Sequence, residues 1–299
     1  MKKRQLLSFE LFPPKTDRGM ANLSETIQQL CRYKPEYISV TYGAGGGNVG
    51  ANREVCRMVR NAGTVPVTHF TVIRNTKQGI REQLETYLKE GVDHILALRG
   101  DFPRGETSTG GDFNYATDLV KFIRDEFGEQ FEIAVAGSPE GHISCRSLEA
   151  DIGVLKMKQD NGADYIMTQL CWDMEQFERW LDKIRRAGVP LPVDVGIMPI
   201  LDQAATINMA LSRNGCVMDR ELSRLISKYW IFPNPFDKAP FDDSLEQKKA
   251  DFKKAGIEYT IRQIDKYRSL GVEGIHLYAM NKWKDVSQII ERSGIRTLI

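Results

Sequence analysis

The chain has 299 residues, with 41 lysines and arginines against 40 aspartates and glutamates, so its formal net charge is +1. This balance excludes the broad basic surface that is typical of proteins binding nucleic acid or anionic membranes. Hydrophobic residues make up 41% and charged residues 27%, which excludes a disordered chain. No apolar run approaches the roughly 18 residues of a membrane span, and the five cysteines lack metal-site spacing. We therefore expect a cytoplasmic protein with no metal, no nucleic-acid partner and no membrane span.

Short apolar segments alternate with longer helical patterns along the whole chain. The apolar segments are aliphatic or β-branched on both faces, as in strands of a buried parallel sheet. We expect strands at 5–11, 36–41, 65–71, 94–98, 132–136, 165–168, 193–197 and 274–278. Apolar residues three and four positions apart indicate helices at 23–33, 53–62, 80–90, 116–127, 148–161, 175–187, 203–214 and 245–270. Five helices are followed by a glycine before the next strand, which predicts left-handed helix ends at Gly63, Gly91, Gly162, Gly188 and Gly271.

This alternation predicts an α/β protein in which residues 1–299 form a single (β/α)8 TIM barrel. The alternative is a doubly wound open sheet, which usually has a glycine-rich turn after its first strand. Here the first strand is followed by FPPKT at 12–16, which offers no such turn. A proline-rich segment at 230–243 interrupts the pattern, and we interpret it as a surface insertion rather than a domain boundary.

In such a barrel the functional groups lie at the carboxyl ends of the strands. Glu10 lies in the apolar segment SFELFPP, where burial should raise its pKa and suit it to act as a general acid. A structural salt bridge is the alternative for Glu10. His69 on the third strand, taken alone, is more typical of a core histidine. Arg99 and Asp101 follow the fourth strand, and an ion pair between them is the alternative to a ligand site. More polar residues follow the second, fifth and sixth strands: Thr41, Tyr42, Ser138, His142 and Gln169.

Several motifs occur in order through the chain: SFELFPPKT at 8–16, YISVTYGAGG at 37–46, THFT at 68–71, HILALRGDFP at 94–103, SPEGH at 138–142, DNGADYIMTQLCWD at 160–173 and GIMPI at 196–200. In these motifs the chain resembles the methylenetetrahydrofolate reductase family in its short bacterial form. The resemblance implies a barrel that holds a flavin at its C-terminal rim. It also implies that a hydride passes from a donor to flavin N5 and then to 5,10-methylenetetrahydrofolate, which becomes 5-methyltetrahydrofolate.

The resemblance also assigns roles to residues at matching positions. It implies that Glu10 gives a proton to folate N10, that Asp101 lies near the flavin pyrimidine edge, and that Gln169 binds the pterin. It places Asp101 and a further set of residues in contact with the flavin: Thr41, Tyr42, Ala44, His69, Arg99, Gly100, Ala116, Ser138, His142, Asp151 and Lys158. Gln203 and Lys282, together with Gln169, match positions that contact substrate.

Three positions depart from the bacterial pattern. Ser138 replaces a tyrosine, Gln203 replaces an aromatic residue that packs against the dinucleotide and folate, and Lys282 replaces an arginine. The resemblance favours FAD over FMN as the flavin. The sequence does not decide whether the electron donor is NADH, NADPH or a partner electron-transfer subunit. The oligomeric state is also undecided, and a homo-oligomer or a hetero-oligomer is possible.

Two other classes of protein remain as alternatives. A non-catalytic flavin-binding barrel would not need Glu10, which the chain has. An aldolase- or lyase-type barrel would need a strand-end lysine or metal ligands, and the expected strands end in neither.

Overall fold

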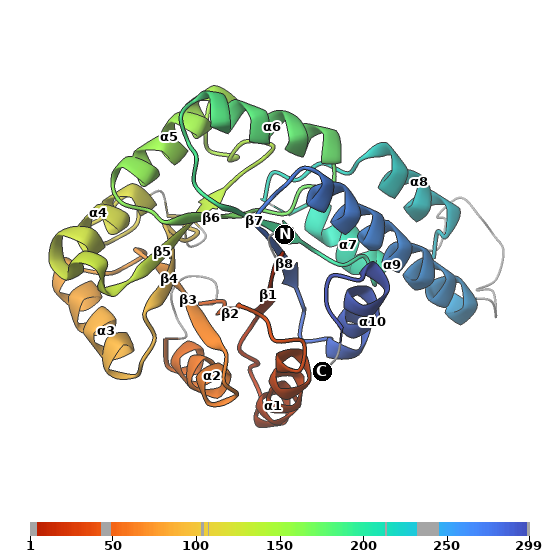
Figure 1. Ribbon diagram of the computed structural model, residues 1–299, viewed down its shortest axis with the longest axis horizontal. Helices are drawn as coiled ribbons and strands as arrows, with labels where there is room; N and C mark the ends of the chain where they lie inside the picture. Colours follow the sequence, from red (N-terminus) through yellow and green to blue (C-terminus); the bar gives the residue numbers. More distant parts are fainter. Residues whose placement is uncertain are drawn as a thin grey trace.

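The computed structural model describes residues 5–42, 49–102, 105–106, 108–212, 214–231 and 245–297. Eight parallel strands pair in sequence order, and β8 pairs with β1 to close a barrel (Figure 1). The strands are β1 (Leu6–Leu11), β2 (Tyr37–Val40), β3 (Val65–Thr71), β4 (His94–Leu98), β5 (Glu132–Gly137), β6 (Tyr165–Thr168), β7 (Val193–Ile197) and β8 (Gly274–Tyr278). The expected (β/α)8 barrel is confirmed. Most of the proline-rich segment lies outside the described residues, which omit 232–244.

Helices connect successive strands and cover the outside of the barrel (Figure 1). They are α1 (Asp17–Cys31), α2 (Val49–Asn61), α3 (Lys77–Lys89), α4 (Ala116–Phe127), α5 (Leu148–Asp160), α6 (Met174–Arg186), α7 (Gln203–Ala210), α8 (Arg220–Lys228), α9 (Leu245–Ser269) and α10 (Trp283–Ser293), with a 3-10 turn η2 (Gly128–Gln130) after α4. The five glycines expected at helix ends all have positive φ, from 72° at Gly91 to 104° at Gly162, so this prediction is confirmed.

Capping side chains explain two of the differences between the observed helices and the expected ones, those at α1 and α8. α1 begins at Asp17 rather than Leu23, because the Thr16 side chain accepts a hydrogen bond from the first turn. α8 was not expected, and it begins after Asp219, which caps it in the same way. α10 was not expected either, and α7 ends at Ala210, earlier than its apolar pattern suggested.

Alternate strand residues face two different cores. On β1, Leu7, Phe9 and Leu11 pack outward into the large core between strands and helices. A smaller cluster fills the inside of the barrel: Tyr37, Val67, Leu96, Ala134, Tyr165 and Met167. Polar strand residues are buried as well: Ser8, Ser39, His69, Asp194 and His276. The packed barrel therefore carries polar groups beneath its C-terminal rim.

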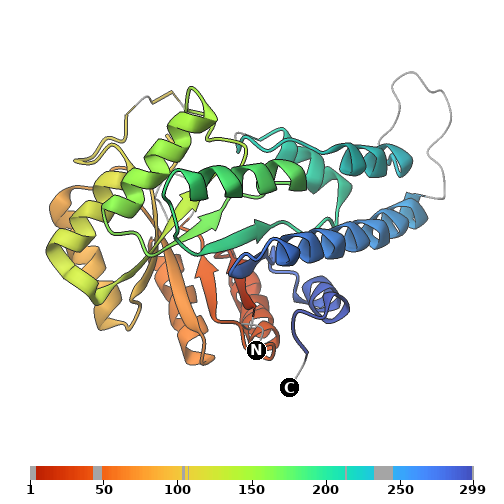
Figure 2. The ribbon, with the colours of Figure 1, turned by 45° about the horizontal axis from the view of Figure 1, so that its top comes forward.

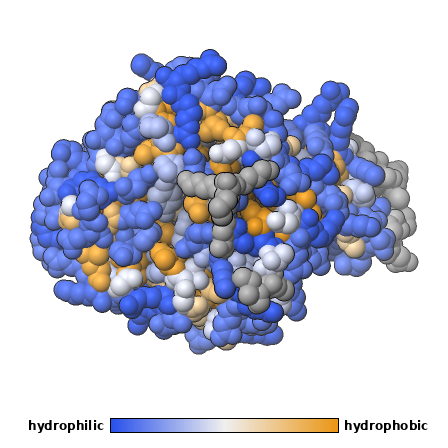
Figure 3. All heavy atoms as spheres, viewed as in Figure 1, coloured by the Kyte–Doolittle hydropathy of each residue, from blue (hydrophilic) through white to orange (hydrophobic). Residues whose placement is uncertain are grey.

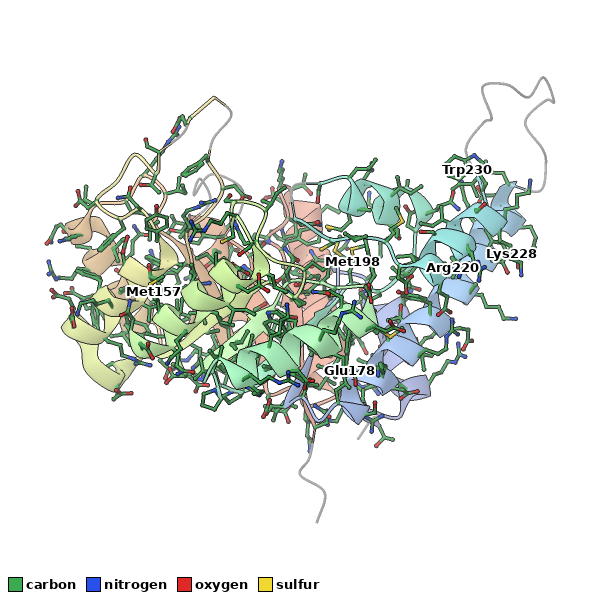
Figure 4. All side chains as sticks on the ribbon, turned by 90° about the horizontal axis from the view of Figure 1, so that it is seen from above. Met157, Glu178, Met198, Arg220, Lys228 and Trp230 are labelled. Atoms are coloured by element: carbon green, nitrogen blue, oxygen red, sulfur yellow. The ribbon has the colours of Figure 1, made fainter. Side chains whose placement is uncertain are left out.

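α8 and α9 lie side by side at one end of the molecule (Figure 2). Figure 4 shows Arg220, Lys228 and Trp230 at that end, whereas Met198, just after β7, lies near the middle. In Figure 3, hydrophobic residues gather around the middle of the face seen in Figure 1 and hydrophilic residues dominate its edge. Within the described ranges, none of the helices has the length and apolar character that crossing a membrane requires.

Candidate active site

Glu10 lies near the end of β1, and three strands converge on it. Its Oε2 lies 3.4 Å from Nε2 of His69 on β3 and 3.9 Å from Nε2 of His276 on β8. The Glu10 carbonyl accepts a hydrogen bond of 3.1 Å from the Ala279 N–H, which fixes the end of β1 to the residue after β8. The Glu10 side chain is 23% exposed. One partly exposed carboxylate is therefore held beside two buried imidazoles.

The pKa of Glu10 lies below its ordinary value, so the expected rise is wrong. Burial raises this pKa, but the interaction with His276 and the charges of His69 and His276 together lower it by more. Burial in turn lowers the pKa of His69, and the Glu10 carboxylate partly opposes that shift. The apolar neighbours of Glu10 in sequence do not reveal histidines that arrive from other strands. In this structure Glu10 is ionised at neutral pH, so it must receive a proton before it can donate one.

His276 is a site residue that the sequence analysis missed. It is 1% exposed, with Nδ1 2.7 Å from the Ser8 hydroxyl and Nε2 3.2 Å from the Ser39 hydroxyl. Ser8 pairs with His276 across the β1–β8 ladder, and Ser8 and Glu10 share one face of β1. The alternation of polar residues along β1 was the sequence signal that could have shown an inward polar face.

The turn after β4 contains Arg99, Gly100 and Asp101. Gly100 has φ +85°, and a Cβ at this position would lie 2.6 Å from the Ile73 side chain. The Arg99 guanidinium lies 4.5 Å from the ring centre of Phe102, and its Nε donates to the Gly100 carbonyl at 3.2 Å. Asp101 is exposed. No ion pair joins Arg99 to Asp101, both of which the structure describes, so their charges remain available to a ligand.

Charged residues also gather where β5 ends and α5 begins. Lys158 Nζ donates to the Ala136 carbonyl at 2.8 Å, and Asp151 accepts a 3.2 Å hydrogen bond from the His142 N–H. Burial lowers the pKa of Lys158, and the charge of Asp151 opposes this. Burial also lowers the pKa of His142; Arg99 and Lys158 act in the same direction and Asp151 against them. These interactions place Arg99, His142, Asp151 and Lys158 in one region, between the ends of β4 and β5.

The residues after β2 lie beside Glu10. The Thr41 N–H donates to the Leu11 carbonyl at 3.0 Å, so Thr41 follows the edge of β1. Tyr42 is 3% exposed and its hydroxyl donates to Gln83 on α3 at 2.7 Å, while burial raises its pKa to about 12. The Tyr42 hydroxyl is therefore occupied by its hydrogen bond to α3, and only the backbone atoms of Tyr42 are left to contact a ligand. Ala44 lies outside the described residues, and Ala116 is the half-buried first residue of α4.

Gln169, after β6, is positioned by the end of β5. Its N–H donates to the Gly137 carbonyl at 2.8 Å, and its Oε1 accepts from the Leu170 N–H at 3.0 Å. These contacts leave the side-chain NH2 group of Gln169 to bind a ligand. Gln169 and Ser138 line one small hollow together with Pro139, Glu140, Gly141, Leu170, Asn214, Gly215 and Cys216.

Glu140, in that hollow, is another polar group that the sequence analysis did not single out. Its carboxylate accepts a hydrogen bond from the Val217 N–H at 3.1 Å. Burial raises its pKa to about 7.

Both polar atoms of the Gln203 side chain are hydrogen-bonded inside the protein. It is 1% exposed, its Nε2 donates to the Ile226 and Tyr229 carbonyls, and its Oε1 accepts from the Ile231 N–H. The whole amide is occupied in packing α7 against α8, so none of its polar atoms is free here, and the substrate contact expected for Gln203 stays a prediction. Lys282, in contrast, is exposed directly before α10.

The site therefore has two chemically different parts. Glu10 with His69 and His276 can transfer a proton, and the charged residues between β4 and β5 can bind an anionic group. The Thr71 hydroxyl is buried without a hydrogen-bond partner in the described part of the chain, so it can bond a ligand. Among those same described residues, no cluster of histidine, cysteine, aspartate or glutamate is arranged to hold a metal ion.

Comparison with known proteins agrees on one family. The family described as methylenetetrahydrofolate reductase matches residues 1–226. The 5,10-methylenetetrahydrofolate reductase of Escherichia coli is 30% identical over 291 residues, covering 97% of this chain and 91% of the relative. Methylenetetrahydrofolate reductase 1 of Schizosaccharomyces pombe is 32% identical over 98% of this chain, and an Arabidopsis thaliana enzyme, methylenetetrahydrofolate reductase (NADH) 1, is 33% identical over 96%.

The relatives differ in length. The chain spans about half the length of the S. pombe and A. thaliana relatives, 47% and 48% respectively. Among solved structures, a Clostridium thermocellum protein that binds two copies of 5-methyl-5,6,7,8-tetrahydrofolic acid has a TM-score of 0.61 at 11% identity. That comparison covers 98% of this chain and 96% of the other, and at this identity it shows a shared fold.

Proposed function

This chain belongs to the methylenetetrahydrofolate reductase family, and on that premise we propose that it reduces 5,10-methylenetetrahydrofolate to 5-methyltetrahydrofolate with a bound flavin. The observation that carries the proposal is the position of Glu10 at the barrel mouth, 3.4 Å from His69 and 3.9 Å from His276. Opening the ring of the methylene substrate requires a proton on N10, and a carboxylate coupled to imidazoles can supply it.

The residues around the rim fit a flavin. Gly100 lets the turn after β4 pack closely against Ile73 and Thr71, and the Thr71 hydroxyl has no hydrogen-bond partner among the described residues, so it can bond the cofactor. Arg99 and Lys158 supply positive charge for a phosphate, and both lie close enough to His142 to lower its pKa, which Asp151 opposes. When bound, the flavin would accept a hydride at N5 and pass it to the folate.

The protein's own groups then have distinct tasks. Glu10 gives its proton to folate N10, and the free NH2 group of Gln169 bonds the pterin. The exposed carboxylate of Asp101 favours the cationic iminium that forms on the folate after ring opening. Lys282, directly before α10, offers a positive charge to the substrate's carboxylates.

The cofactor is FAD rather than FMN, and the donor is a reduced nicotinamide. The Arabidopsis thaliana relative named for NADH supports a nicotinamide donor. The occupied side chain of Gln203 offers no contact to that donor, so it does not help to distinguish NADH from NADPH. A partner electron-transfer subunit remains the alternative source of electrons.

Purification and anaerobic spectroscopy test the proposal. We expect a yellow protein that releases FAD on denaturation and that is bleached by NADH or NADPH. Adding 5,10-methylenetetrahydrofolate should restore the oxidised spectrum and yield 5-methyltetrahydrofolate. A protein that binds no added flavin would overturn the proposal. Bleaching by a low-potential donor but by neither nicotinamide would identify a partner-fed enzyme.

A further inference from the structure

Asn52 on α2 carries a buried amide that joins three other elements of the fold. The residue is fully buried. Its Nδ2 donates to the Val40 carbonyl at 3.0 Å and to the Thr41 carbonyl at 3.2 Å, at the end of β2. Its Oδ1 accepts from the Thr68 hydroxyl on β3 at 2.9 Å and from the Tyr87 hydroxyl on α3 at 2.7 Å. Both N–H groups and both lone pairs of the amide are therefore used.

These contacts occur where the pairing of β2 with β3 ends. The β2–β3 ladder runs as far as Val40 and Thr68, whereas β3 continues beside β4 to Thr71. Thr41 stays with β1, because its N–H donates to the Leu11 carbonyl. α2 packs against both β2 and β3 from outside the barrel (Figure 1). Its amide therefore links the two strand ends across the point where their own pairing stops.

The buried face of α2 is otherwise apolar or thiol-bearing. Its other buried residues are Val55, Cys56 and Val59. Asparagine has a lower helix propensity than alanine, and a buried amide without partners is strongly unfavourable. The contribution of Asn52 is therefore its hydrogen bonds, and two of the four elements that they join are strand ends at the barrel mouth.

Those strand ends lie on either side of functional groups. Alternate residues of β3 face opposite ways, so Thr68 faces α2 while His69 faces the inside of the barrel, with Nε2 3.4 Å from Glu10. Thr41, on the β2 side, is one of the positions expected to contact the flavin. Asn52 thus holds the residue next to a partner of the proposed acid, and it also holds the backbone of an expected flavin contact.

Three titratable side chains interact with Glu10: His69 on β3, and His276 and Tyr278 on β8. The two histidines lower the pKa of Glu10 against the effect of burial. Of the three, His69 lies on a strand that Asn52 holds. If the end of β3 loosens, the influence of His69 weakens and the pKa of Glu10 rises.

We propose that Asn52 is a positioning residue of the reductase reaction, which holds the ends of β2 and β3 so that the flavin binds and His69 stays beside Glu10. The inference rests on the proposed function. Asn52 acts through Thr41 and Thr68, and neither a proton nor an electron passes through its amide.

Three variants of the full-length flavin-loaded protein separate this role from general stability. Asn52→Ala removes the amide. Thr68→Val keeps the size of the side chain and removes only the bond from β3. Tyr87→Phe is the matched control, because it removes an equally buried hydroxyl from the same Oδ1, but on the side of α3. It leaves the Thr68 bond and the 3.6 Å contact of Cys56 with Oδ1 in place.

The first readout is flavin affinity, measured from the FAD released on dilution at a temperature where circular dichroism shows every variant folded. We expect Asn52→Ala to raise the dissociation constant on the order of tenfold, because two hydrogen bonds to β2 are lost, and Thr68→Val to raise it about threefold. Tyr87→Phe should lower thermal stability as Thr68→Val does, but keep the dissociation constant within about twofold of wild type.

The second readout is the pH dependence of flavin reoxidation by 5,10-methylenetetrahydrofolate, which a merely structural role would not shift. In Thr68→Val the rate should fall at a higher pH than in the wild type, because a raised pKa keeps Glu10 protonated to higher pH. Tyr87→Phe should keep the wild-type profile.

Wild-type affinity and pH profile in both Asn52→Ala and Thr68→Val would overturn the inference, and so would equal changes in Tyr87→Phe. If Asn52→Ala does not fold, the contrast between Thr68→Val and Tyr87→Phe decides. If the wild type binds FAD and is reoxidised by the folate while the variants behave alike, only the inference fails. A wild type that binds no FAD would mean that the proposed function itself has failed, and the inference with it.

Discussion

The Asn281 side chain bonds both backbone groups of Phe12, accepting from its N–H at 3.3 Å and donating to its carbonyl at 2.9 Å. This pair of hydrogen bonds extends the β1–β8 contact past the Glu10 carbonyl, which itself accepts from Ala279. It also stabilises an unusual turn, because Met280 and Asn281 both have positive φ, 49° and 53°. The loop after β8 is thereby fixed beside Phe12, two residues after the proposed acid Glu10.

Asn281→Gly should lower the free energy of unfolding by about 1–2 kcal/mol, because glycine tolerates the turn but both hydrogen bonds are lost. Met280→Gly is the matched control, since it relieves the same backbone strain without removing a hydrogen bond to Phe12. Urea denaturation of both variants checks this. A loss for Met280→Gly equal to that for Asn281→Gly would contradict the importance of the Asn281 contact.

Gly100→Ala should destabilise the protein and reduce flavin retention. The left-handed backbone costs an alanine about 1–2 kcal/mol, and its Cβ would also lie 2.6 Å from Ile73. Gly105→Ala is the control, because Gly105 has nearly the same φ, 84°, but nothing within 4 Å of its added Cβ. Thermal unfolding and flavin content of the two variants separate the cost of the backbone from the cost of the clash. Equal effects would show that the space beside Ile73 is unimportant.

Lys158→Met should lose bound flavin while the fold persists. Lys158 is a half-buried cation whose charge is favoured by Asp151 and lowers the pKa of His142, so its removal leaves the proposed phosphate region less positive. Lys156→Met on the same helix removes an exposed charge that pairs with Asp160. Absorbance of the purified variants measures the flavin retained per chain. Full occupancy in Lys158→Met would remove this residue from the flavin site.

Asp194 should also change how stability depends on pH. Its pKa in the folded protein is about 6 against an ordinary 3.8, so the native state binds more protons than the unfolded chain between these values. The free energy of unfolding therefore falls as pH rises through about 4 to 6, by on the order of 3 kcal/mol from this group.

Asp194→Asn should lack this component. The difference between the stabilities of wild type and variant, measured by urea denaturation at pH 4.5 and pH 7.5, checks it. A difference that does not change with pH would show that Asp194 is not a proton-binding group in the native state.

The barrel could be predicted because its signals are local. Apolar strands and helix-ending glycines such as Gly91 lie within a few residues of the features that they determine. α8 and α10 were missed because their amphipathic patterns are short, and Asp219 at the start of α8 becomes recognisable as a cap only with its helix in view.

The site could be predicted only in part, because its chemistry depends on contacts between strands. Glu10 was identified from one segment, but the direction of its pKa shift comes from His69 and His276, which lie far away in sequence. The sequence around Gln203 likewise does not reveal that its side-chain amide donates to the Ile226 carbonyl on α8. Where each polar side chain points is decided by tertiary packing.

The proton-donor role of Glu10 is the central claim, and the two half-reactions of Glu10→Gln test it most directly. Glutamine keeps the shape of the side chain but cannot give a proton to folate N10. In anaerobic stopped-flow measurements we expect NADH or NADPH to reduce the flavin of the variant at nearly the wild-type rate. Reoxidation by 5,10-methylenetetrahydrofolate should fall by about a hundredfold or more. Wild-type reoxidation in Glu10→Gln, or equal loss of both half-reactions with the flavin still bound, would contradict the assignment of Glu10 as the acid.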